Sequence, residues 1–155
     1  MSYQKWLMKT EPNTYSIDDL ASDGSTQWEG IRNYQARNFM MNDMTIGDDV
    51  LIYHSNAKPP GIIGLAKVCS EPYPDHFAWN DQSPYFDPKS PKSNPRWFMI
   101  DIEYVAKFSE LITLDQLKKD PKVSDMMVLK KGMRLSIQPV SDDHFNYIVK
   151  EYGKK

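Results

Sequence analysis

Two β-rich runs joined by a proline-rich turn constrain the fold of this chain more than any other feature of its sequence. The runs cover residues 50–55 and 62–68, and Pro59-Pro60-Gly61 between them is typical of a turn. So short a connection favours antiparallel pairing of the two strands. Gly64, inside the second run, predicts a β-bulge or the close approach of another backbone. The pair predicts an antiparallel or mixed sheet.

Apolar patterning predicts three more strands. Residues 3–9 form the first, with Trp6 and Met8 on one face and Leu7 on the other. Residues 96–106 form a long strand and residues 134–138 form the last one.

Hydroxyl and amide side chains mark the starts of four helices. Ser16, Thr113 and Ser141 stand at N-cap positions, and residues 33–42 form a further helix that begins at Asn33. Strands and helices are interspersed without a regular βαβ rhythm. This order predicts an α+β domain, in which helices flank a small barrel-like sheet.

The segment 72–95 differs from the rest because it holds six of the chain's 11 prolines. Aromatic side chains, among them Tyr73 and Tyr85, lie between the prolines and can fix the segment in place. A loop of this length inside a compact domain is uncommon and is often functional. We therefore predict an ordered cover and not a linker between domains.

Length, charge and cysteine content exclude several classes of protein. The 155 residues suffice for one domain with a real core and leave little room for a second. A net charge of -2 argues against coating nucleic acid through bulk electrostatics, although it allows a local basic rim around a small site. Cys69 is the single cysteine, and no apolar run approaches the ~20 residues that span a bilayer. We expect a cytoplasmic protein, or a nuclear one in a eukaryote, without a membrane partner.

Groups that could perform chemistry are few. The three histidines lie far apart without the spacing of a zinc site, so we expect no metal and no cofactor, and we expect His54 to be a hydrogen-bonded structural residue. Lys9, Thr10 and Glu11 form one reactive cluster. A lysine deprotonated by burial, together with a hydroxyl and a carboxylate, suffices in kind for amide hydrolysis. The same side chains also suit structural hydrogen bonds at a turn.

Residues 28–38 combine an aromatic ring, a glycine and polar groups in the sequence WEGIRNYQARN. Gly30 lets the backbone come close to a planar guest, on which Trp28 could stack. Asn33 could present its amide to the edge of that guest, and Arg32 and Arg37 could contact phosphates. Each residue also has an ordinary structural role, as core, helix cap or solvated charge.

Five motifs resemble, in order, those of the EVE domain family, and the resemblance runs from about residue 3 to residue 152. Ile31 and Ile137 stand where valine is common in the family, which leaves the chemistry unchanged. The motifs are WLMKTEP (6–12) followed by YSI (15–17), GIRNYQARN (30–38), YHS (53–55), PGIIG (60–64) and RLSIQPV (134–140).

The resemblance implies a PUA-like fold, a curled β-sheet pseudo-barrel flanked by short helices, formed by residues 1–155 as one domain. It also implies a relation to YTH domains, which hold a methylated base between aromatic side chains. We therefore expect a monomeric, non-catalytic module that binds a modified cytosine or adenine base in DNA or RNA. The resemblance implies that a base stacks on Trp28 and that Lys9, Asn33 and Ser55 form hydrogen bonds with its edge. Tyr53 shares a strand face with Ser55 and can address the same pocket. Arg32 and Arg134 are the candidates for phosphate contacts at the opening of the pocket.

Two other functions stay open. The first is a small amidohydrolase that acts on a modified nucleobase or nucleoside through Lys9, Thr10 and Glu11, since some PUA-like domains of the ASCH type are amidohydrolases. The second is a protein-interaction scaffold, for which the segment 72–95 is the candidate surface.

Overall fold

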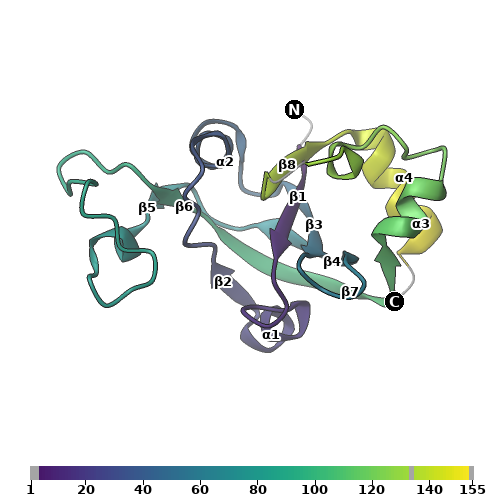
Figure 1. The fold of residues 1–155 in the computed structure, drawn as a ribbon, viewed down its shortest axis with the longest axis horizontal. Helices are drawn as coiled ribbons and strands as arrows, with labels where there is room; N and C mark the ends of the chain where they lie inside the picture. The colour runs from purple at the N-terminus through teal and green to yellow at the C-terminus, as the bar shows by residue number, and fades with distance from the viewer. Residues whose placement is uncertain (1–3, 133–134, 154–155) are drawn as a thin grey trace.

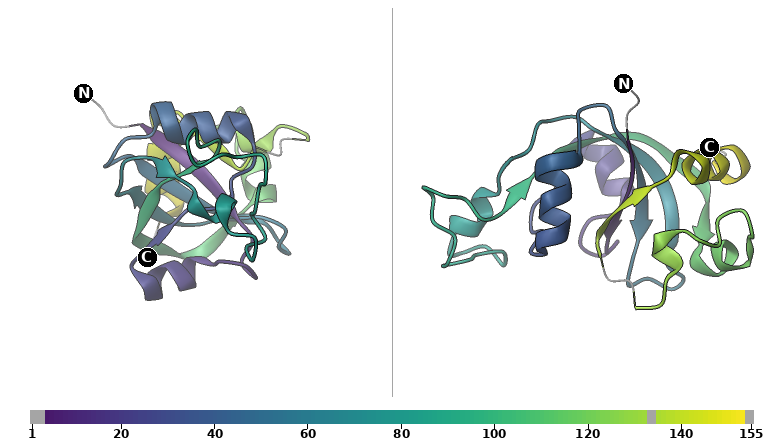
Figure 2. Two further views of the ribbon diagram at one scale, coloured as in Figure 1. Left: turned by 90° about the vertical axis from the view of Figure 1, so that its left-hand side faces the viewer. Right: turned by 90° about the horizontal axis from the view of Figure 1, so that it is seen from above.

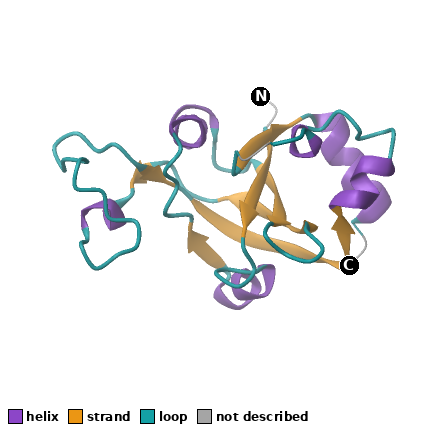
Figure 3. Ribbon diagram, in the orientation of Figure 1, coloured by secondary structure: helices purple, strands orange, loops and turns teal. Residues whose placement is uncertain are grey.

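The computed structural model describes residues 4–132 and 135–153, and a six-stranded sheet forms its centre (Figures 1 and 3). In chain order the strands are β1 (Lys5–Thr10), β2 (Ser25–Gln27), β3 (Asp49–His54), β4 (Gly61–Val68), β7 (Asp101–Thr113) and β8 (Ile137–Val140). In space they follow the order β2-β7-β4-β3-β1-β8. β1 and β3 run parallel, and the other neighbours in this sheet run antiparallel. The mixed sheet curls into a half-barrel, which confirms the expected architecture (Figure 2).

Short helices flank the sheet in the described part of the chain: α1 (Ile17–Asp23), α2 (Tyr34–Asn38), α3 (Leu114–Lys119) and α4 (Asp142–Tyr152). The predicted N-caps are confirmed, because the side chains of Ser16, Asn33, Thr113 and Ser141 each accept a hydrogen bond from a backbone N–H in the first turn. The helix predicted over 33–42 is split, since α2 passes into a π-helical turn at Phe39–Asp43. Within residues 4–132 and 135–153, no helix has the length and apolar character needed to cross a membrane.

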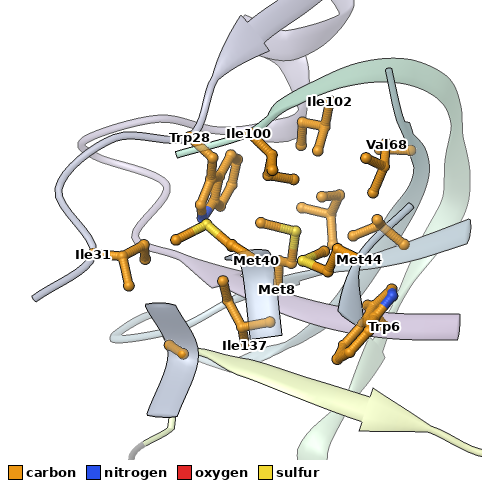
Figure 4. Packing of buried hydrophobic residues seen from close by; sticks show 14 of the residues in the cluster. Trp6, Met8, Trp28, Ile31, Met40, Met44, Val68, Ile100, Ile102 and Ile137 are labelled. Atoms are coloured by element: carbon orange, nitrogen blue, oxygen red, sulfur yellow. The ribbon is translucent and has the colours of Figure 1, made fainter. Parts of the chain in front are cut away.

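β1 is buried on both faces and separates two apolar cores. Its Trp6 and Met8 point into the first core and its Leu7 points into the second, which confirms the predicted alternation (Figure 4). The first core contains Trp6, Met8, Trp28, Met40, Ile52, Ile100 and their neighbours, and the second contains Leu7, Leu51, Tyr53, Phe108, Phe145, Ile148 and theirs.

The bulge predicted at Gly64 is confirmed, because the pairing of β4 with β7 shifts register between Ile62 and Gly64. A Cβ atom at Gly64 would lie 2.6 Å from the carbonyl oxygen of Ala106, so the two backbones approach too closely for a side chain.

One strand of the six-stranded sheet is absent from the prediction, and the bounds of two others differ from it. The sequence pattern does not predict β2, because its residues Ser25, Thr26 and Gln27 are all polar and show no alternation. The strand predicted over 96–106 is divided, because residues 98–99 pair with β5 (Tyr73–Pro74) in a separate sheet and β7 begins at Asp101. β7 continues past residue 106 to Thr113, and its second half contributes to the second core. β8 begins at Ile137 and not at residue 134, and Arg134 lies outside the described residues.

The proline-rich segment and the residues that follow it up to Met99 form a lobe (residues 72–99) beside one end of the sheet, on the left in Figure 1. Two short strands, β5 (Tyr73–Pro74) and β6 (Phe98–Met99), pair at its base. Inside the lobe the indole Nε1 of Trp97 donates a hydrogen bond of 2.6 Å to Asp87. The segment, for which the sequence predicts an ordered cover, folds back so that β5 pairs with β6, and it lies beside the sheet and not across it.

Candidate functional site

A cavity of about 350 Å³ opens where β1 ends, and the chain that follows β2 forms its opposite side. One ring from the lobe, that of Tyr85, completes the wall. The cavity is lined by Lys9, Thr10, Glu11, Thr14, Tyr15, Thr26, Gln27, Trp28, Glu29, Gly30, Ile31, Tyr85 and Ser136.

Gly30 is the point at which the lobe meets the cavity. Its φ of 81° lies in the left-handed region that favours glycine. A Cβ atom there would lie 2.5 Å from Cε1 and Cζ of Tyr85, so a side chain would collide with the ring. The sequence predicts that Gly30 admits a planar group, and in the structure that place is taken by Tyr85 of the same chain. The close approach sets the ring as one wall of the cavity.

Trp28 belongs to both the cavity and the first core. Its backbone N–H donates a hydrogen bond of 2.8 Å to Ile100, which extends the pairing of β2 with β7. Its indole packs among apolar side chains that include Ile31 and Met40 (Figure 4). The residue is 8% exposed, and it lines the cavity. Core packing therefore holds the ring rigidly at the cavity wall.

Lys9 and Glu29 bring two partly buried titratable groups to the cavity. Burial lowers the pKa of the Lys9 ammonium from its usual 10.5. Burial also raises the pKa of the Glu29 carboxyl from its usual 4.5, and the nearby charge of Asp75 adds to this shift, whereas a hydrogen bond from the backbone of Glu29 opposes it. Both residues line the cavity and are partly removed from water, and the Lys9 ammonium lies 5.7 Å from the centre of the Tyr53 ring.

Glu29 and Tyr85 are not among the site residues that the sequence predicts. Glu29 stands between Trp28 and Gly30 in the motif at 28–38, and this position is the sequence feature that could have identified it as a site residue. Tyr85 reaches the cavity only through the tertiary position of the lobe, for which the sequence carries no local signal.

Asn33, Tyr53 and Ser55 are not among the residues that line this cavity, although Tyr53 neighbours Lys9 and Ser55 neighbours Thr10, which do line it. Asn33 is exposed, and its side chain accepts a hydrogen bond of 3.0 Å from the backbone of Ala36 as the N-cap of α2. Tyr53 is 4% exposed in the second core, on the other face of the sheet from the core of Trp28. Ser55 follows β3 and donates its backbone N–H to Thr10. The ligand contacts assigned to these three residues stay predictions, and Arg134 lies outside the described residues.

Arg32 fastens the lobe to the cavity wall. Its Nε and Nη2 donate hydrogen bonds of 3.2 and 2.6 Å to the carbonyl oxygen of Tyr85. Its Nη1 donates to Asp75 at 3.0 Å, and the side chain of Asp75 is completely buried. Asp75 also accepts a hydrogen bond of 2.8 Å from the backbone N–H of Gly30. The guanidinium is therefore engaged within the protein, and its contact with phosphate stays a prediction.

The cluster of Lys9, Thr10 and Glu11 lines the cavity but also has structural partners. The Thr10 hydroxyl donates a hydrogen bond of 2.8 Å to the carbonyl oxygen of Tyr15. Glu11 is exposed and accepts a hydrogen bond of 3.0 Å from the Asn56 side chain. The turn role expected for Thr10 is thus confirmed.

His54 has the structural role that the sequence predicts. Its Nε2 accepts a hydrogen bond of 3.1 Å from the backbone N–H of Ile17, and burial lowers the pKa of its imidazole from 6.5. Among the described residues, no group of three or more His, Cys, Asp or Glu side chains is placed to hold a metal ion.

Comparison with known proteins shows which family this chain resembles. Residues 4–151 match the family model described as EVE domain. Human thymocyte nuclear protein 1 is 39% identical over 93% of this chain and 72% of its own length. A solved structure of a hypothetical protein from Leishmania major is 44% identical, with a TM-score of 0.90 over 96% of this chain and 94% of that one. The crystal structure of human THYN1 protein in complex with 5-methylcytosine containing DNA is 37% identical, with a TM-score of 0.88 over 98% of this chain and 99% of that one.

Proposed function

Because this chain belongs to the EVE domain family, we propose that it is a binding module that takes a modified nucleobase of DNA or RNA into the cavity beside Trp28. The observation that carries the proposal is a cavity lined by two aromatic rings, those of Trp28 and Tyr85, together with polar side chains. The complex of the human relative with DNA that contains 5-methylcytosine supports the same class of ligand.

The energetics of such a site are favourable for an unpaired base. Removing a base from a duplex costs a few kcal/mol, and less if the base is already unpaired. Stacking on an aromatic side chain returns about 1–3 kcal/mol per base. The cavity volume of about 350 Å³ falls within the usual range for small-molecule pockets, about 300–1,000 Å³. A planar base therefore has both the room and the stacking surface that it needs.

We assign the edge of the base to Lys9 and Glu29. A carboxylate accepts a hydrogen bond from the exocyclic amino group of cytosine, and a lysine donates to ring or carbonyl acceptors. Adenine also carries an exocyclic amino group, whereas uracil and thymine carry a carbonyl acceptor in its place. A carboxylate at Glu29 thus favours derivatives of cytosine and adenine over those of uracil and thymine.

A single-stranded oligonucleotide with one 5-methylcytosine is expected to bind about ten-fold more tightly than its unmodified counterpart. Burial of one extra methyl group in an apolar niche contributes only about 1–3 kcal/mol, so the preference is moderate. The measurement is competition fluorescence anisotropy with 5-methylcytosine, 5-hydroxymethylcytosine, N6-methyladenine and unmodified strands of one sequence. Equal affinity for all four strands of the panel would contradict the proposal.

Hydrolysis of a modified nucleoside is a second candidate, favoured by one observation: the partly buried Lys9, whose pKa is lowered, lines the same cavity as Thr10 and Glu11. If this candidate holds, incubation with N4-acetylcytidine yields cytidine and acetate, and Lys9→Met abolishes the yield. Chromatography of the nucleosides measures the reaction. Because the binding module needs no chemistry, we expect the substrate to be recovered intact at high protein concentration.

A further inference from the structure

A second and larger hollow, of about 650 Å³, lies between α2 and the end of the lobe. It shares no lining residue with the cavity beside Trp28. We call it the basic groove, and it is lined by Tyr34, Arg37, Met41, Lys89, Pro91, Asn94, Pro95, Arg96 and Phe98.

The charge of the basic groove is opposite to that of the whole chain. Its lining holds three cations, Arg37, Lys89 and Arg96, and no carboxylate, in a protein of net charge -2. Arg96 is paired with Asp87 at 3.6 Å. Within the described part of the chain Lys89 is exposed and forms no ion pair. The groove therefore keeps a local positive charge.

The partners of Arg37 fix its position without cancelling its charge. Its Nη1 donates a hydrogen bond of 2.9 Å to the carbonyl oxygen of Arg96, and its Nε and Nη2 donate to the side-chain oxygen of Asn38. Both acceptors are neutral. A guanidinium held in this way is preorganised for an anion, since little side-chain freedom remains to be lost on binding.

A continuous series of ring contacts joins the basic groove to the base cavity. The Arg32 guanidinium lies 5.7 Å from the centre of the Tyr85 ring, which lines the cavity, and 5.4 Å from the centre of the Trp97 ring. Trp97 stacks on Tyr34 with ring centres 4.9 Å apart, and Arg37 lies 4.7 Å from the centre of the Tyr34 ring. Tyr34 and Arg37 line the groove. The groove is thus a neighbour of the cavity, within reach of a strand whose base occupies it.

We propose that the basic groove binds the phosphodiester backbone of the strand that flanks the captured base, with Arg37 and Lys89 as its phosphate contacts. This inference rests on the proposed function. Cations in a groove track a nucleic-acid backbone without reading its sequence. Met41, Pro95 and Phe98 supply an apolar surface for the sugar carbons.

The test is the length and salt dependence of binding, measured for the wild type, Lys89→Ala, Lys89→Glu and Arg37→Gln. The ligands are free 5-methyl-2'-deoxycytidine and a nine-nucleotide single strand with 5-methylcytosine at its centre, and an unmodified strand serves for comparison. Log K falls with log salt, and each lost phosphate contact makes this fall less steep by about 0.7. The corresponding loss of affinity at 0.1 M salt is about five-fold. We expect this loss for Lys89→Ala, a larger loss for Lys89→Glu, and an unchanged ratio of modified to unmodified strand. Binding of the free nucleoside should not change.

Lys118→Ala is the matched control, because Lys118 is an exposed lysine on α3, at the opposite end of the molecule from the lobe (Figure 1). If the wild type prefers the modified strand but the Lys89 and Arg37 variants keep its affinity and salt slope, the groove proposal is wrong and the base-binding proposal stands. If the wild type shows no preference for the modified base, the base-binding proposal fails instead. Competition by polyglutamate as effective as that by the unmodified strand would assign the groove to acidic peptides and overturn the inference. Because Lys89 is exposed, its variants keep the test valid even if Arg37→Gln unfolds.

Discussion

Replacing Trp28 by alanine is expected to abolish the preference for a modified base and to lower the free energy of unfolding by about 3–5 kcal/mol. Both effects have one cause, since the same indole fills the first core and forms the cavity wall. Loss of the stacking surface alone removes about 1–3 kcal/mol of binding free energy, a five- to 150-fold loss of affinity. Urea denaturation measures the free energy of unfolding, and anisotropy with the modified and unmodified strands measures the preference.

Conservative variants separate the two effects. Trp28→Phe keeps a ring at the wall and should retain much of the affinity, with a smaller loss of stability. Trp6→Phe is the matched control, because Trp6 is 1% exposed in the same core and does not line the cavity. It should lose stability, in part because its indole N–H donates to the buried Asp48, yet bind the modified strand normally. If Trp6→Phe lowers affinity as much as Trp28→Phe does, the stacking role of Trp28 is refuted.

Replacing Asp75 by alanine is expected to detach the lobe from the cavity wall and to cost about 3 kcal/mol of stability. Its buried carboxylate accepts hydrogen bonds from the Gly30 backbone, the Phe77 backbone and the Arg32 guanidinium. Alanine leaves these donors without their acceptor, and the guanidinium of Arg32 loses its ion pair. The Tyr85 ring should then leave the cavity, which weakens binding of the modified base.

The measurements for Asp75→Ala are hydrogen exchange across the lobe, thermal denaturation and binding. Faster exchange confined to residues 76–94 and to the chain around Gly30 would agree with detachment of the lobe. Asp75→Asn keeps an acceptor but not the charge, so its effects should be smaller. Native exchange rates in the lobe of Asp75→Ala would show that the Arg32 contacts to Tyr85 suffice to hold it.

Features encoded by neighbouring residues could be predicted from the sequence. The N-caps at Ser16, Thr113 and Ser141 depend on side chains within one turn, and the two faces of β1 follow from alternation alone. The family resemblance then supplied the fold. β2 could not be predicted because its three polar residues are held by backbone pairing with β7, and their side chains show no pattern that indicates a strand.

The site was less predictable because its parts meet through contacts between distant residues. The sequence predicts that Arg32 is a solvated or phosphate-binding charge. In the structure Arg32 donates a hydrogen bond to Asp75, which is 43 residues away in the chain. Tyr53 and Ser55 share a strand face, as alternation predicts, but alternation cannot tell which face of the sheet Trp28 covers. The structure places Trp28 and Tyr53 in different cores. Lys9 and Trp28 are the predicted residues that line the cavity, and the Lys9 ammonium lies 5.7 Å from the centre of the Tyr53 ring.

The position of β1 has a consequence for how a ribosome makes this protein. β1 precedes the other described strands in the chain, yet it lies inside the sheet and pairs with both β3 and β8. The backbone N–H of Lys9, at the cavity, donates to Ser136, which immediately precedes β8. Until that late segment emerges, one edge of β1 lacks its partner, and the nascent chain keeps apolar surface open to aggregation or to chaperones. The pocket is thus completed only once Ser136 and β8 have been made, so a chain that stops before Ser136 carries Lys9 and Trp28 without a finished binding site.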